Sequence, residues 1–258
     1  MNSIQKGGLW EMTGQAKAVT FIGAGGKTTC VKRLSAEIQA AGYPVVASTS
    51  TKVFPDRSFY PWQSQDSAPE ETVEYPCFWF GGIEQETGKW YGPSLNTMDQ
   101  AIRAESGEGV REAKAERYWV IEGDGAKGKR LKLWNEREPQ IPQASECVVL
   151  VVDGSLWGRR LEAEDVHRPE RFPELIGEIF DHGNFRRYLS ISPIFWMQYR
   201  QMSWVVFLNQ SSDGKLLEAS GQTRLQSEML GKQLKKPAHL RLAAGQAKEG
   251  MIQWYDWW

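Results

Sequence analysis

The chain has 258 residues and a mass of 29.3 kDa, enough for one large α/β domain or two small ones whose core needs no disulfide or metal staple. Hydrophobic residues make up 41% and charged residues 24% of the chain, which excludes a disordered protein. The 31 basic and 32 acidic residues give a formal charge of -1, so the positive field typical of a nucleic-acid-binding protein is absent.

Cysteine usage and hydropathy predict a cytoplasmic protein. Cys30, Cys77 and Cys147 lie far apart and form no C-x-x-C motif, which is typical of a reducing compartment. Residues 1–12 contain no apolar core of signal-peptide length, and the longest apolar run, residues 147–152, is too short to cross a bilayer. We therefore expect no membrane association.

The first predicted elements form a β-loop-α-β unit. Residues 18–22 read as a short buried strand that leads into glycines. Apolar side chains then recur at helical spacing over residues 27–41, and Gly42 ends this helix. Residues 43–47 read as the next strand, which completes the unit from which parallel sheets are built.

The central part of the chain alternates predicted loops with strands and helices. Residues 48–76 are polar and rich in proline, which predicts a loop. Two short β-rich runs flank Gly81-Gly82 and predict a hairpin, and a helix is expected beginning near Pro169. The remaining expected elements are helices over residues 96–115 and 213–231, a loop over 122–142, and strands over 117–121, 147–152, 204–208, 239–243 and 251–254.

No internal repeat or linker interrupts this order, which predicts a single domain over residues 1–258. The predicted fold class is α/β, a P-loop NTPase-like three-layer fold with a mainly parallel central sheet.

The sequence Gly23-Ala24-Gly25-Gly26-Lys27-Thr28-Thr29 lies where the first strand turns into the first helix. Glycines there let successive backbone N–H groups point at one spot, and the helix N-terminus and Lys27 add positive charge for phosphates. The hydroxyl of Thr28 would coordinate Mg²⁺. The motif G-x-x-x-x-G-K-[ST] would need glycine at Phe21, and the alternative interpretation is a glycine-rich turn with an exposed lysine. The strand-before, helix-after context favours phosphate binding.

Glu122 and Asp124 directly follow the strand predicted over residues 117–121. Ligands bind at the carboxyl edge of open α/β sheets, so this position suits two functional carboxylates. One could hold Mg²⁺ through water and the other could position an attacking water. The alternative is a turn whose aspartate and glycines serve the backbone.

A second polar group is His167-Arg168-Pro169-Glu170. Arg168 could contact a phosphate or an anionic substrate, and His167 could transfer a proton. The alternative is that Pro169 starts a helix, Glu170 favours its first turn, and both neighbours are simply solvated.

The chain contains 12 tryptophans, and Trp254-Tyr255-Asp256-Trp257-Trp258 forms its end. Core packing is the simpler interpretation of these rings. The alternative is an aromatic docking surface at the C-terminus.

Several stretches together resemble the YqeC-type family, whose members are described as accessory proteins of selenium-dependent hydroxylases in selenium cofactor biosynthesis. Their order and spacing, rather than any single motif, carry the resemblance over residues 19–170. The matching stretches are residues 23–29, Ser48-Thr49-Ser50-Thr51-Lys52, Glu122-Gly123-Asp124-Gly125-Ala126-Lys127-Gly128, Glu136-Arg137-Glu138-Pro139 with Ile141-Pro142, and Val166-His167-Arg168-Pro169-Glu170.

The resemblance implies a P-loop NTPase-like protein that acts near the maturation of molybdenum hydroxylases containing selenium. It implies phosphate and Mg²⁺ binding by Lys27 and Thr28, and sensing of the γ-phosphate by a loop that includes Thr51 and Lys52. It also implies an acidic centre at Glu122 and Asp124, with Lys127 and Lys132 beside it. For His167 and Arg168 it implies function rather than solvation. In place of the family's base-reading element the chain has Asn209-Gln210-Ser211-Ser212-Asp213.

The leading hypothesis is an Mg²⁺-dependent ATP- or GTP-binding enzyme that hydrolyses or transfers phosphate. Its expected partners are the nucleotide, an unidentified small molecule, and a molybdenum hydroxylase or its maturation machinery. The alternatives are a small-molecule kinase or nucleotidyltransferase, and a non-catalytic nucleotide-switched adaptor that docks through the C-terminal tryptophans.

Overall fold

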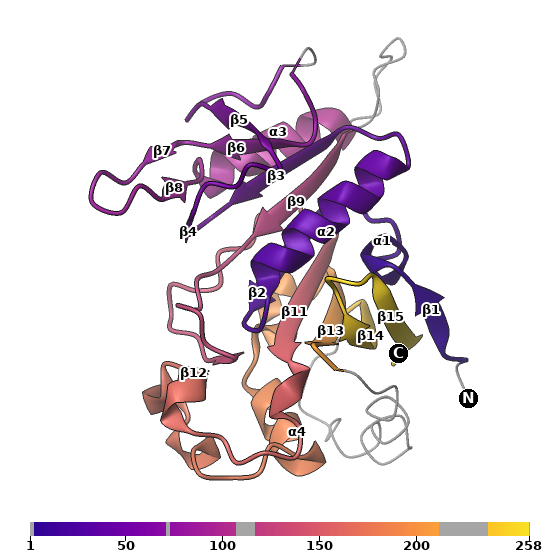
Figure 1. Ribbon diagram of the computed structural model, residues 1–258, viewed down its shortest axis with the longest axis vertical. Coiled ribbons are helices and arrows are strands. Elements are labelled where there is room, and N and C mark those ends of the chain that lie inside the picture. Colours follow the sequence, from indigo (N-terminus) through magenta and orange to yellow (C-terminus); the bar gives the residue numbers. More distant parts are fainter. Residues whose placement is uncertain (1–2, 71–72, 107–116, 212–236, 258) are drawn as a thin grey trace.

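The computed structural model describes residues 3–70, 73–106, 117–211 and 237–257 (Figure 1). Within these residues the chain forms one ten-stranded sheet with helices on both faces, so the prediction of an α/β fold with a mainly parallel central sheet is confirmed at that level. The strands across the sheet are, in order, β1 (Gln5–Gly7), β15 (Met251–Asp256), β14 (His239–Gln246), β13 (Ser203–Asn209), β11 (Cys147–Asp153), β2 (Ala18–Gly23), β9 (Tyr118–Glu122), β3 (Val45–Thr49), β6 (Cys77–Phe80) and β5 (Tyr60–Gln63).

The eight strands from β14 to β5 all pair in parallel, and β15 and β1 close one side of the sheet in antiparallel fashion. Because both faces are covered, the inner strands are apolar along their length, as in β11, where all of Cys147–Asp153 is buried. The carboxyl ends of the parallel strands therefore meet along one edge of the sheet.

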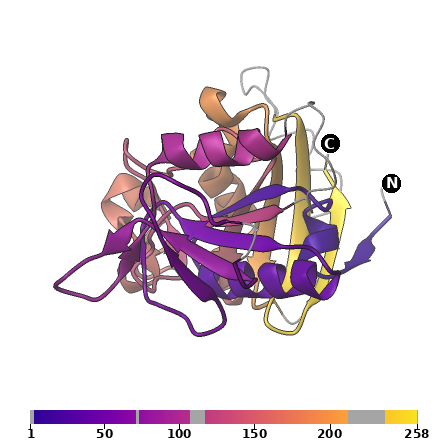
Figure 2. The ribbon, with the colours of Figure 1, turned by 90° about the horizontal axis from the view of Figure 1, so that it is seen from above.

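Helices α1 (Leu9–Met12) and α2 (Lys27–Ala40) cover one face of the sheet, and α3 (Leu95–Ser106) and α4 (His182–Ser190) cover the other (Figure 2). Alternate side chains of the strands separate the two cores: in β11, Val149 packs toward α2 and Leu150 packs toward α4. The α2 helix turns its buried residues, among them Leu34 and Ile38, onto the sheet at the spacing expected from the sequence.

Two small sheets stand beside the carboxyl edge of the main sheet. One contains β4 (Lys52–Val53), β8 (Trp90–Tyr91) and β7 (Gly82–Ile83), all antiparallel. The other pairs β10 (Leu131–Lys132) with β12 (Val166–His167) in parallel. The predicted loops over residues 48–76 and 122–142 thus contain short strands, and β5, inside the first, joins the main sheet.

The predicted hairpin differs from the observed pairing. Its first arm, residues 76–80, enters the main sheet as β6, and the antiparallel partners around Gly82 are β7 and β8. Part of the helix predicted over residues 96–115 is α3, and residues 107–116 and 213–231 lie outside the described part of the chain.

The helix predicted to begin near Pro169 is wrong. The segment forms two separate 3-10 turns, Pro169–Arg171 and Pro173–Leu175, and the helix follows later as α4. Phe172, Leu175 and Ile176 imitate a helical period, but Pro173 has no N–H to continue a first helical turn, and each proline starts a turn of its own.

The C-terminal aromatic segment belongs to the core. Trp254, Tyr255 and Trp257 are 3%, 7% and 3% exposed, and β15 is held between β14 and β1. Core packing is thus the correct interpretation of these rings, and the docking surface is wrong for residues 254–257. None of the helices described is both long and apolar enough to cross a membrane.

Candidate functional site

The candidate site lies where the chain reverses the order of its strands. From β2 the chain runs to β3 and back to β9 on one side, and then crosses to β11 on the other. In open α/β sheets such a switch point leaves a crevice at the carboxyl edge. The strand ends and the loops that follow them bring Gly23, Thr49, Glu122, Asp153 and Asn209 to this crevice.

The turn after β2 depends on glycine. Gly23, Gly25 and Gly26 have φ angles of +93°, +87° and +111°, which side chains rarely adopt. A Cβ on Gly25 would lie 2.5 Å from the backbone nitrogen of Asp153, and one on Gly23 would lie 2.3 Å from the carbonyl oxygen of Val151. The turn is thus packed directly against the end of β11, and Ala24 N donates to the same Val151 carbonyl at 2.9 Å.

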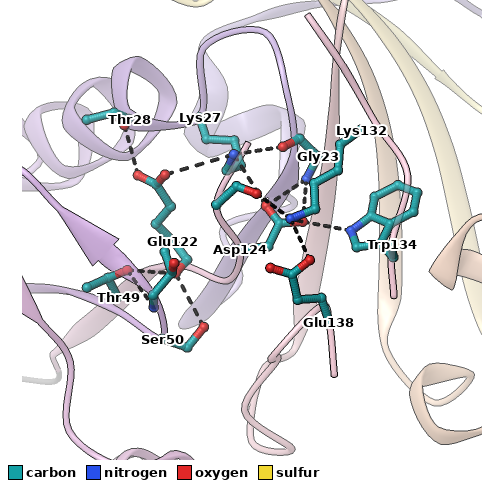
Figure 3. Close-up of polar contacts among 12 residues, drawn as sticks. Gly23, Lys27, Thr28, Thr49, Ser50, Glu122, Asp124, Lys132, Trp134 and Glu138 are labelled. Carbon is teal, nitrogen blue, oxygen red and sulfur yellow. Dashed lines mark hydrogen bonds and ion pairs between the residues drawn. The ribbon is translucent and has the colours of Figure 1, made fainter. Parts of the chain in front are cut away.

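Lys27 opens helix α2 and turns its side chain back over this glycine turn (Figure 3). Its Nζ donates to the carbonyl oxygen of Gly23 at 2.7 Å and lies 3.3 Å from Asp124 Oδ1 and 3.9 Å from Glu122 Oε1. The side chain is only 5% exposed. A buried ammonium at the N-terminus of a helix concentrates positive charge at one point of the crevice.

Thr28 and Glu122 form an oxygen-rich pair beside Lys27. The hydroxyl of Thr28 donates to Glu122 Oε2 at 2.9 Å. Burial raises the pKa of Glu122, and the charge of Lys27 and the Thr28 hydrogen bond oppose this rise. A hydroxyl and a carboxylate on adjacent elements are donors that Mg²⁺ accepts, with water and phosphate oxygens completing its octahedron.

Asp124 is saturated by other contacts. It accepts from Gly23 N at 3.1 Å and from Trp134 Nε1 at 2.7 Å, and it pairs with both Lys27 and Lys132. Its side chain is fully buried. This carboxylate therefore holds the glycine turn and the lysine in place.

A row of ion-paired side chains continues from Asp124 away from the crevice. Lys132, whose side chain is 0% exposed, lies 3.5 Å from Asp124 Oδ2 and 3.0 Å from Glu138 Oε2, and Glu138 also accepts from Arg168. Burial lowers the pKa of Lys132. Burial, together with the charges of Lys132 and Arg168, lowers the pKa of His167 to about 4. Each buried charge thus has an opposite charge next to it.

His167 and Arg168 lie at the far end of this row. Neither lines the crevice beside Lys27. Ion pairs connect Arg168 to the glycine turn through Glu138, Lys132 and Asp124. Arg168 has a φ of +63°, unusual for a residue with a side chain.

The crevice is a cleft of about 530 Å³ with a basic lining. Gly25, Gly26, Thr28 and Thr29 are among its lining residues. Among the described residues that line it are three acidic side chains, Asp56, Glu122 and Asp153, and seven basic ones, Lys27, Lys32, Lys52, Lys89, Lys127, Lys129 and Arg130. A cleft with this excess of positive charge attracts polyanions.

The other predicted residues are distributed around the cleft. Lys52 lines it, and Thr51 lies beside it, because a Cβ on Gly125 would be 3.3 Å from Thr51 Oγ1. Asn209 Nδ2 donates to the carbonyl of Gly25 at 2.8 Å and its Oδ1 accepts from Ala247 N at 3.0 Å, so its amide supports the glycine turn. Asp213 lies outside the described residues.

Sequence reasoning missed several charged residues of the cleft, among them Asp153 and Arg130. Asp153 ends β11 and accepts from Ser155 N at 3.0 Å, and Arg130 Nε lies 3.2 Å from Asp153 Oδ2. The rule that selected Glu122, a carboxylate at the carboxyl end of a buried strand, selects Asp153 equally well. Arg130 has no local signal, because only the fold brings it to β11.

Fold and site together define an α/β protein with a basic, glycine-lined cleft at the switch point of a mainly parallel sheet. The chain belongs to the YqeC family: residues 19–170, more than half of the chain, match the family described as "YqeC protein". It is 29% identical over 163 residues to the Escherichia coli (strain K12) protein named "Uncharacterized protein YqeC". The matched region covers 62% of this chain and 60% of that protein. The chain thus matches less than two thirds of this relative's length. No solved structure matches the chain.

Proposed function

We propose that the protein is an Mg²⁺-dependent nucleoside-triphosphate-binding protein with a P-loop NTPase-like fold. The main support for this proposal is the glycine turn of residues 23–26, where Gly23, Gly25 and Gly26 have positive φ angles. This turn leads into α2, which has Lys27 and Thr28 at its start. Glycines, a helix N-terminus and a buried lysine at one point form an anion site of the kind that cradles phosphates.

In the proposed binding step, Lys27 exchanges its contact with the Gly23 carbonyl for the β- and γ-phosphates. Backbone N–H groups of the turn and of the first turn of α2 donate to the same phosphates. Thr28 and Glu122 would hold Mg²⁺, which neutralises phosphate charge. Asp124 keeps Lys27 and the Gly23 amide aligned before the nucleotide arrives, so little reorganisation is needed.

Family membership suggests the wider role. We place the protein as a cytoplasmic accessory factor in the maturation of selenium-dependent molybdenum hydroxylases, with such a hydroxylase or its maturation machinery as partner. This assignment rests on the family resemblance, whereas the nucleotide assignment rests on the site.

One observation favours a kinase or nucleotidyltransferase over a simple hydrolase. The cleft extends beyond Lys27 toward Lys52, Phe54 and Lys89, which leaves room for a second ligand. The adaptor alternative loses its proposed docking surface, because residues 254–257 are part of the core.

The test is calorimetric titration of the protein with ATP and with GTP in Mg²⁺, followed by a phosphate-release assay. We expect binding of one nucleotide, weakened at least about tenfold by Lys27→Ala, since charged hydrogen bonds contribute about 1.5–3 kcal/mol. Lys248→Ala, at an exposed lysine outside the cleft, is the control. Because Lys27→Ala leaves buried carboxylates, circular dichroism must show a folded variant, and Thr28→Ala should reduce the Mg²⁺ dependence alone. Unchanged nucleotide affinity in a folded Lys27→Ala protein refutes the assignment.

A further inference from the structure

The cleft extends on both sides of the glycine turn, toward residues 52–56 and toward residues 127–130. Lys27, Thr28 and Glu122 mark where the terminal phosphates would bind under the proposed function. Glu122 ends β9, which lies between β2 and β3 in the sheet. The terminal phosphate would therefore face the β3 side, and what lies there is the segment after β3, residues 52–56, together with Lys89.

Phe54 is the unusual residue of this segment. It lines the cleft and is 68% exposed, and Lys89 Nζ lies 4.8 Å from the centroid of its ring. A single exposed aromatic residue on a surface is ordinary, but one inside a basic cleft offers a flat apolar face next to bound anions. Phe54 and Pro55 are both exposed cleft residues.

The aromatic side chains of the neighbouring core pack against one another without the ring of Phe54. Phe80 and Trp90 stack there with centroids 4.2 Å apart, and Phe78 packs against both Phe59 and Trp90. Val53, the neighbour of Phe54 in the chain, packs against this core and pairs with Trp90 across β4 and β8. The segment is thus fixed by Val53, while Phe54 remains at the cleft.

Positive charge surrounds the exposed ring. Lys52, Lys89 and Lys32 all line the cleft on this side, and Asp56 is the acidic residue among them. Lys32 pairs with Asp56, and Lys52 pairs with Glu84, outside the cleft lining. These pairs are at least partly exposed, so an arriving anion can compete for the lysines at little cost.

We propose that this half of the cleft is a second-ligand subsite for a planar aromatic anion, whose ring stacks on Phe54 and whose charge is bound by Lys89 and Lys52. This rests on the proposed function, since the bound nucleotide defines which half remains open. Aromatic stacking and a nearby cation together recognise one class of molecule, a flat ring system that carries an acidic group.

The test uses pyrene-1-sulfonate as a fluorescent probe and protein saturated with Mg²⁺ and a non-hydrolysable ATP or GTP analogue, so that the phosphate site is filled. We expect the probe to bind, Phe54→Ala to weaken it about tenfold, and Lys89→Gln to weaken it about threefold. Both variants should bind the nucleotide analogue as wild type does. Ile83→Ala, at an exposed apolar residue of the same small sheet outside the cleft lining, is the matched control and should change nothing. Uncharged 1-pyrenemethanol should bind more weakly than the sulfonate.

The two proposals fail in different ways. If the analogue binds but the probe does not, or binds equally well to Phe54→Ala, the subsite is refuted and the nucleotide site stands. Equal losses in Ile83→Ala and Phe54→Ala would also refute it, because the probe would then report general surface hydrophobicity. If neither nucleotide analogue binds the wild-type protein, the proposed function fails and the subsite inferred from it falls too.

Discussion

The row of alternating charges from Glu122 to Glu138, here called the floor, and the rim of the cleft contain the same kinds of charged residues in opposite environments. On the floor, the side chains of Lys27, Asp124 and Lys132 are at most 5% exposed, and each is within 4 Å of an opposite charge. On the rim, Lys52 is 54% exposed where it pairs with Glu84. Floor charges cannot leave their partners without a large desolvation cost, whereas rim charges exchange partners with water and ions.

This difference separates two tasks. The floor alternates sign from Glu122 through Lys27, Asp124 and Lys132 to Glu138, an arrangement that fixes the glycine turn before any ligand binds. The rim holds charges that are available to ligands of varying shape. Variants matched between floor and rim test whether the two sets of charges differ in this way.

The largest effect is expected from Lys132→Ala on the floor. It leaves the buried Asp124 and the partly buried Glu138 without one of their cations, so we expect a loss of about 3–4 kcal/mol in the free energy of unfolding, or about 6–15 °C in Tm. Thermal unfolding at pH 7 measures it. Lys52→Ala is the rim control and should lower Tm by less than about 3 °C. Similar shifts for both variants would contradict the distinction between floor and rim.

Gly25→Ala tests the glycine turn against a glycine of the rim. The new Cβ would lie 2.5 Å from Asp153 N at a φ of +87°. We expect the free energy of unfolding to fall by about 2–3 kcal/mol and nucleotide binding to be lost. Gly128→Ala is matched, because Gly128 lines the same cleft at a φ of +73° but a Cβ added there would meet nothing within 4 Å. This variant should lose only about 1 kcal/mol in the free energy of unfolding and keep its nucleotide affinity. Retained affinity in Gly25→Ala would show that the turn is not the phosphate site.

A pH titration of stability tests the far end of the floor. The pKa of His167 falls from 6.5 to about 4 on folding, so below pH 6.5 the unfolded chain takes up the proton first. The wild type therefore loses stability as pH falls from about 6.5 to 4, by about 1–2 kcal/mol once solvent screening is allowed for. Glu122, whose pKa is raised, contributes in the opposite direction, so the quantity to measure is the difference from His167→Gln by urea unfolding at each pH. Parallel curves for the two proteins would contradict the lowered pKa.

The local parts of this architecture could be predicted from the sequence. Residues 18–47 contain strand, glycine turn, helix and strand in an order set by neighbouring residues, and the structure has them as β2, α2 and β3. The rule that ligands bind at the carboxyl edge of the sheet predicted that Glu122 lies near Lys27, although the two residues are far apart in the chain. Lys132 lies beside Asp124, as the family resemblance implied, whereas Trp134 contacts Asp124 because the chain returns after it, and no spacing in the sequence encodes that return.

Wrong elements came from patterns that tertiary structure overrode. A helix was expected from Pro169, but Pro173 interrupts it, and the apolar side chains of this segment pack onto the α4 side of the core from short turns. Residues 254–257 are different, because core packing was the simpler interpretation of their rings and the structure buries Trp254, Tyr255 and Trp257 as that interpretation expected. Composition alone does not decide whether a run of tryptophans packs in the core or forms a docking surface.

The smallest effect is expected from Glu84→Gln on the rim. Lys52 and Thr87 donate to this carboxylate and lower its pKa, so it is ionised at neutral pH and competes with anions for Lys52. Without that charge we expect Tm to stay within about 2 °C of wild type and the affinity for a cleft-bound anion to rise by at most about threefold at 50 mM salt. The gain should vanish at 0.5 M salt, because exposed charges are screened, whereas the Tm loss of Lys132→Ala should persist there. A gain that survives high salt would mean that Glu84 acts on the cleft through its shape, and the rim would then be as preorganised as the floor.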